Sequence, residues 1–248
     1  MIERRRLTNE DVRRLIFGSI ELVQEAQTTL NLALSPNLHL TKEKLREGEF
    51  WADEVERGKA CLYGMDFGCF TPPNTISLDR ELPFSDNPLD IPELASTLTL
   101  YSAVHEVIHA DDYFGGDKLL NITKDHMLEK HKDKLQQAMS LLKEQGNNDA
   151  IKDINALANL SAQHYVDMVT HYRSYVILNY ANAPKLELIW NRLSEDYFPP
   201  YLLTRIELEK GREYVFDLFT KHAGEYCLIE AFEEYELIGE KQGSASIV

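Results

Sequence analysis

The sequence predicts an α+β fold that is mostly α: a helical bundle with a small N-terminal β-sheet. Apolar residues make up 44 % of the 248 residues and aromatic residues 10 %, a composition typical of a globular protein with a sizeable core. Residues after 90 show helical periodicity almost throughout, whereas a period-two pattern occurs only within 60–82. No linker is long enough to require two domains, so we expect one domain over 1–248.

The first region of this domain, 1–59, is predicted to be helical. Thr8 offers a hydroxyl cap and acidic residues follow it, so a helix should run from there to about Leu32. Pro36 lies in the turn that follows this helix. The charged residues 41–59 are expected to form one or two further short helices.

The second region, 60–123, contains the strand signal and one long helix. Apolar and polar side chains alternate within 74–82, which predicts one or two strands in the segment 60–82. A helix should begin near Asp90 and continue to about Tyr113, because a glycine pair follows and is typical of a helix C-terminus.

The third region, 124–242, is predicted to be helical throughout, and residues 243–248 form a frayed tail. Glycine, asparagine and proline clusters divide this region into separate helices. The expected helices cover roughly 124–145, 148–181, 185–195, 200–220 and 223–238.

Composition also restricts the partners and the compartment. The formal charge of −15 repels a phosphate backbone, so nucleic acid is disfavoured as a partner. There is no run of 18 apolar residues, so a membrane span is not expected. Three cysteines without a Cys-x-x-Cys pair, and an N-terminus without an apolar signal segment, favour a cytoplasmic protein.

The motif that carries chemistry is His105-Glu-Val-Ile-His109, in the second half of the helix that begins near Asp90. At about 100° per residue, His109 lies about 40° round from His105 and one turn along, so both imidazoles can bind one metal ion. Glu106 lies at the edge of the same face, where it can act as a general base toward water.

This motif, with the strand before it, resembles the zincin-type metallopeptidases, among which are the gluzincins. In that superfamily an edge strand precedes the motif helix, and the segment 74–82 resembles that strand. The resemblance implies zinc bound by His105 and His109, with Glu106 activating water. It further implies a peptide or protein substrate, which an extended chain would present to the free edge of the strand.

A catalytic zinc ion takes a third protein ligand, and the sequence offers several candidates. The metzincin spacing fails because Asp112 and Gly115 occupy the positions of its glycine and histidine, and Asp112 suits a supporting role. Glu230 lies in a segment similar to the one that bears the third ligand in several gluzincins, and we select it. The alternatives are Glu213, His164, His171 and Asp117.

The function predicted from the sequence is therefore a zinc-dependent hydrolase, a metallopeptidase that cleaves peptide bonds. The first alternative is a metal-stabilised interaction protein without catalytic activity. The second is a dimetal carboxylate redox protein, because Glu106-x-x-His109 also fits the pattern of such bundles, although a second Glu-x-x-His is missing.

Overall fold

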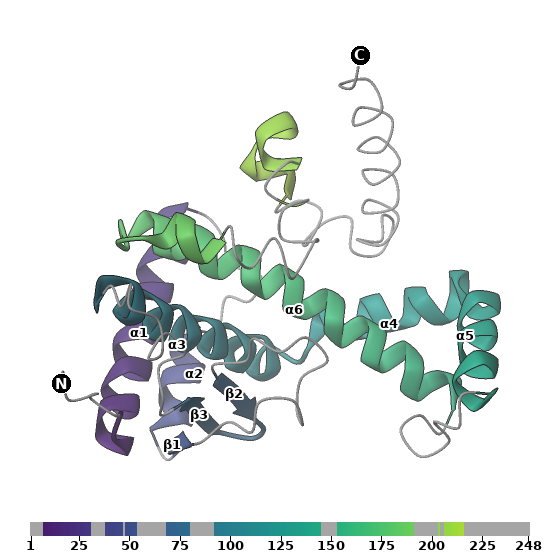
Figure 1. The fold of residues 1–248 in the computed structure, drawn as a ribbon, viewed down its shortest axis with the longest axis horizontal. Helices are drawn as coiled ribbons and strands as arrows, with labels where there is room; N and C mark the ends of the chain where they lie inside the picture. The colour runs from purple at the N-terminus through teal and green to yellow at the C-terminus, as the bar shows by residue number, and fades with distance from the viewer. Residues whose placement is uncertain are drawn as a thin grey trace. The chain divides into compact units, whose positions relative to one another are not determined.

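The computed structural model describes residues 7–30, 38–46, 48–53, 68–79, 92–144, 153–190, 203 and 206–215. These residues are mostly helical with one small sheet, which confirms the predicted fold class (Figure 1). Contacts divide the chain into two compact units. Unit 1 comprises Met1–Gly116 and Thr170–Phe198, and unit 2 comprises Asp117–Val169 and Pro199–Val248.

Unit 1 is built around the motif helix α3 (Pro92–Phe114). Helix α3 packs against α1 (Asn9–Leu30), α2 (Leu38–Leu45) and the sheet (Figure 1). Almost every described side chain of α3 between Thr97 and Asp111 is buried, as its apolar sequence predicts. Its C-terminus was also predicted: Gly115 N–H donates to the Asp111 carbonyl at 2.8 Å, and Gly116 adopts φ +90.

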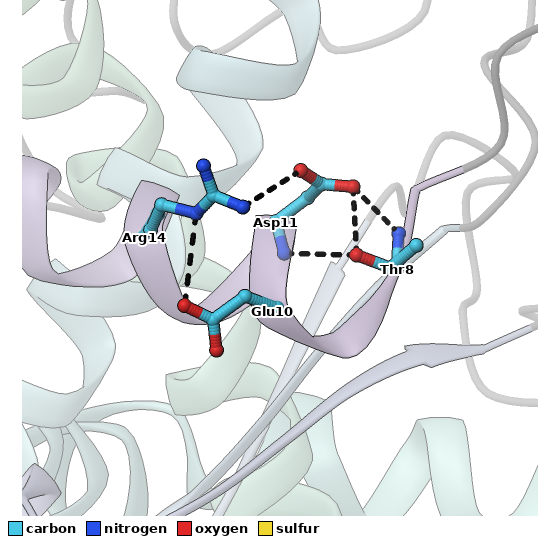
Figure 2. A network of polar contacts seen from close by, with 4 residues as sticks. All are labelled: Thr8, Glu10, Asp11 and Arg14. Carbon is cyan, nitrogen blue, oxygen red and sulfur yellow. Dashed lines mark hydrogen bonds and ion pairs between the residues drawn. The ribbon is translucent and has the colours of Figure 1, made fainter.

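Helix α1 begins at the predicted cap. The Thr8 hydroxyl oxygen accepts a hydrogen bond from the Asp11 backbone N–H at 3.2 Å, and the Asp11 carboxylate accepts one from the Thr8 N–H at 3.0 Å. This reciprocal pair satisfies two backbone donors at the helix start (Figure 2). The buried stripe of α1 then faces the core through residues that include Val12, Ile16 and Ile20, each fully buried.

The sheet has three strands in the order β1-β3-β2. Strand β3 (Thr75–Asp79) pairs in parallel with β1 (Glu49–Asp53) and antiparallel with β2 (Gly68–Thr71). The prediction of one or two strands in 60–82 is thus confirmed, with two strands present. Ile76 of β3 is fully buried and is paired with Phe50 on one side and Phe70 on the other.

Two predictions about this sheet were wrong. The segment 74–82 is not an edge strand, because β3 lies between the other two strands and β2 forms the described edge beside α3. The segment 41–59 is not purely helical, because residues 49–53 form β1. The second error has a physical cause: β1 is only five residues long, shows no alternation of apolar and polar side chains, and becomes a strand by pairing with β3.

Unit 2 has a separate core formed by α4 (Lys118–Lys130), α5 (Lys132–Glu144) and the first part of α6 (Ile154–Tyr180). This core contains Met127, Leu135, Met139, Leu157 and Ala158. Helix α6 continues into unit 1 from Thr170 onward.

The single helix predicted over 124–145 is two helices. His131 separates them: its N–H donates to the Met127 carbonyl at 3.0 Å, and its own carbonyl accepts from Leu135 N–H at 2.9 Å. In one straight helix Met127 and Leu135 would point about 80° apart, so the break lets both side chains enter the same core.

Other predicted helices are shorter or interrupted. Helix α6 begins at Ile154, where the Asp153 carboxylate accepts from Ala156 N–H at 2.8 Å. Residues 186–190 are helical, within the predicted 185–195. The helix predicted over 200–220 is interrupted at Gly211, whose φ of +87 is outside the helical range. The predicted helix 223–238 and the tail 243–248 lie outside the described residues.

Candidate metal centre

Two imidazoles of α3 face each other, one turn apart. The Nε2 atoms of His105 and His109 are 3.0 Å apart, and the two ring centroids are separated by 4.6 Å at an interplanar angle of 81°. His105 is 7 % exposed, and His109 is half-buried. The helical spacing thus places both rings on one face of a buried helix.

A third imidazole, that of His171 on α6, lies against His105. The ring centroids of His171 and His105 are 4.3 Å apart, and His171 is 7 % exposed. The hydroxyl of Tyr101, one turn before His105 on α3, lies 2.8 Å from His171 Nδ1. All four rings belong to unit 1, so this cluster is formed inside one compact unit.

Asp167 adds a carboxylate one turn before His171 on the same continuous helix. One ligand-type atom from each of His105, Asp167 and His171 can be chosen so that all three lie within 4.8 Å of one another. Among the described residues this is the group whose geometry suits a metal ion.

Glu106 points toward the sheet. A Cβ atom added to Gly68 of β2 would lie 2.9 Å from Glu106 Cγ and 3.0 Å from its Oε1. The carboxylate therefore packs against the backbone of the edge strand, and Glu106 is only 5 % exposed. Only a glycine at position 68 leaves room for this arrangement.

A buried ion pair connects α3 and α6 close to the histidines. Arg173 Nη1 donates to both carboxylate oxygens of Asp112, each at 2.9 Å. The side chain of Arg173 is 1 % exposed and that of Asp112 is 11 % exposed. Asp112 follows His109 by three residues, and Arg173 follows His171 by two, so the pair fixes the two helices beside the cluster.

The residues present fit a zinc ion. Zinc binds imidazole nitrogen at about 2.0–2.1 Å in tetrahedral sites, which separates two ligand nitrogens by roughly 3.4 Å. The 3.0 Å between His105 Nε2 and His109 Nε2 is close to this value. Imidazole and carboxylate are also the donor types that zinc prefers. Small rotations of the side chains would open the pair by the remaining few tenths of an ångström.

The remaining candidates for a third ligand are outside this group of described residues or are not described. Glu230, the residue selected from the sequence, lies outside the described residues. Glu213 is exposed and belongs to unit 2. Asp117 is the N-cap residue of α4, with φ 49. His164 lies within α6, but its side chain is not among those described.

The contact of Tyr101 with the histidines was not predicted from the sequence. The signal was present, because residues 101, 105 and 109 are spaced by four and share one helix face. Its partner His171, by contrast, was already an alternative ligand. Only the packing of α6 against α3 reveals that these side chains meet.

Comparisons with protein-family models, curated proteins and solved structures give no match. None of the described helices combines the length and apolarity that crossing a membrane requires.

Proposed function

We propose that this protein is a metal-dependent hydrolase that binds one zinc ion and cleaves peptide bonds. The observation that carries the proposal is the opposed pair of Nε2 atoms, His105 and His109, 3.0 Å apart within a His-Glu-x-x-His helix. A simple hydrogen bond between His105 and His109 in the core would also explain the short distance between their Nε2 atoms. His171 and Asp167 lie close to His105, and these three donors together could hold an ion, which favours the metal site over a simple hydrogen bond.

In this proposal His105, His109 and His171 bind zinc. Asp167 lies within 4.8 Å of ligand atoms of His105 and His171, so it could bind the ion in place of His109 or orient His171. A bound zinc ion supplies a Lewis acid that polarises a carbonyl and lowers the pKa of water. Glu106 takes a proton from the attacking water and passes it to the leaving amine.

The proposed substrate is an extended peptide. Strand β2 is one of the two described edges of the sheet, and its residue Gly68 lies against Glu106. A peptide that pairs with β2 through backbone hydrogen bonds would therefore run close to the proposed general base. In this proposal β2, and not 74–82 as the sequence suggested, is the edge strand with which the substrate pairs.

The first experiment is elemental analysis of the purified protein, followed by digestion of a peptide library with the zinc-loaded enzyme. Glu106→Gln should retain zinc but lose roughly 10²–10⁴-fold in cleavage rate, because only the proton acceptor is removed. Glu129→Gln is the matched control, since Glu129 is an exposed residue of α4. Cleavage at the wild-type rate by the Glu106 variant removes Glu106 from the mechanism.

A second function is favoured by the burial of the cluster. His105 and His171 are each 7 % exposed, so a metal ion there would stabilise the contact between α3 and α6 without any catalysis. A metal-stabilised interaction protein would cleave no peptide and would melt at a lower temperature with chelator. Two iron or manganese ions per chain would instead favour the dimetal redox alternative.

A further inference from the structure

The hydroxyl of Tyr101 makes two contacts with one residue. Its oxygen lies 2.8 Å from His171 Nδ1 and 3.3 Å from the His171 backbone carbonyl oxygen. The carbonyl can only accept a hydrogen bond, and the hydroxyl has a single proton to donate. When that proton goes to the carbonyl, the hydroxyl oxygen accepts a hydrogen bond from Nδ1–H.

Donation to the carbonyl favours the tautomer of His171 that carries its proton on Nδ1. A neutral imidazole has one N–H, so a proton on Nδ1 leaves the lone pair of Nε2 available. The same tautomer is the one that a metal ion bound at Nε2 requires. Histidine ligands commonly donate their second ring N–H to a fixed acceptor, which orients the ring and raises the basicity of the ligating nitrogen.

Burial and ring packing strengthen the effect of Tyr101 on the orientation of His171. Tyr101 is 3 % exposed and His171 7 %, so water is a poor competitor for either contact. The phenol ring stacks at 19° against His171, with 6.0 Å between centroids, and at 19° against His105, with 6.3 Å. Tyr101 therefore limits the rotation of two rings of the cluster.

We propose that Tyr101 is a positioning residue that holds His171 as the Nδ1–H tautomer, so that His171 Nε2 acts as the third metal ligand. The inference rests on the proposed function only in taking zinc as the ion bound by the cluster. Tyr101 itself does not contact the ion or the substrate in this assignment.

The test compares zinc affinities, measured by competition with a chromophoric chelator. Tyr101→Phe keeps the ring and removes the hydroxyl, and it should weaken zinc binding about 10- to 100-fold. Tyr175→Phe is the matched control: it lies on α6 and loses a hydrogen bond of the same length, 2.8 Å, to Glu187. It should bind zinc like the wild type.

Two further measurements separate positioning from a general structural effect. Tyr101→Phe should have no additional effect on affinity in a His171→Ala background, because its influence passes through His171. Long-range ¹H–¹⁵N correlation spectra of the metal-free protein should show Nδ1–H for His171 in the wild type and loss of that preference in Tyr101→Phe.

The outcomes distinguish this inference from the proposed function. Equal zinc affinities for wild type and Tyr101→Phe, or an Nε2–H tautomer in the wild type, overturn the role of Tyr101 and leave the hydrolase in place. Zinc binding that depends on Tyr101, with no cleavage of any peptide, supports the positioning role and overturns the hydrolase. A wild-type protein that binds no zinc overturns both.

Discussion

Replacement of Asp112 by alanine should reduce the free energy of unfolding by about 3–5 kcal/mol, because it leaves a buried guanidinium without its counter-ion. Arg173 is 1 % exposed, and its Nη1 makes both hydrogen bonds to Asp112, each at 2.9 Å. Its other terminal nitrogen, Nη2, is buried and has no hydrogen-bond partner among the described residues. Asp112 is therefore the main compensation that the structure offers for this charge.

The exposed pair between Glu10 and Arg14 provides the matched control. Its atoms are 3.7 Å apart, and the two side chains are 66 % and 70 % exposed. Water screens such a pair, so Glu10→Ala should cost no more than about 1 kcal/mol. The contrast between the two alanine variants isolates the effect of burial from the effect of charge.

Urea unfolding, followed by tryptophan fluorescence, measures the difference. Trp190 is 5 % exposed, is stacked on Tyr175 at 4.2 Å and belongs to the same unit as the ion pair. The double variant Asp112→Leu, Arg173→Met should recover most of the lost stability, since it removes both charges. The reasoning is refuted if Asp112→Ala is no less stable than Glu10→Ala.

Three smaller predictions concern other parts of unit 1. Gly68→Ala should destabilise the protein by about 1–3 kcal/mol in urea unfolding, and should reduce peptide cleavage, because the new methyl group meets Glu106 at 2.9 Å. Thr8→Ala should cost about 1 kcal/mol in the same assay through loss of the helix cap, whereas Thr8→Ser should cost little. The hydrogen bond and the charge of Lys42 lower the pKa of the Glu21 carboxyl, so Lys42→Ala should raise that pKa toward its ordinary value in an NMR titration. Because folding lowers this pKa, the pair of Glu21 and Lys42 stabilises the fold at neutral pH. That contribution to stability disappears as the pH falls through the pKa of Glu21 in the folded state. An unchanged Glu21 pKa in Lys42→Ala would contradict the assignment.

Local sequence was sufficient for features whose partners are near in the chain. The cap of α1 joins Thr8 to a residue three positions later, and the end of α3 depends on two consecutive glycines. The pairing of His105 with His109 follows from helix geometry alone. Each of these interactions spans about one turn, so backbone periodicity fixes it.

Features that depend on distant partners were missed or left open. Strand β1 exists through pairing with β3, 26 positions later by the register of Glu49 with Thr75. The order β1-β3-β2, which places Thr75–Asp79 in the centre of the described sheet and Gly68–Thr71 at one of its two described edges, is likewise a result of packing. Alternation of side chains shows that a segment is a strand but does not show which strands flank it.

The sequence by itself determined the motif helix, its burial and the shared face of two imidazoles, since these follow from a period of 3.6 residues and apolar content. Tertiary structure alone decided that His171 lies against His105, that Tyr101 contacts His171, and that Asp112 pairs with Arg173. These contacts join residues separated by 61 to 70 positions. Such a separation carries no periodic signal, so only the packing of one helix against another selects the partner.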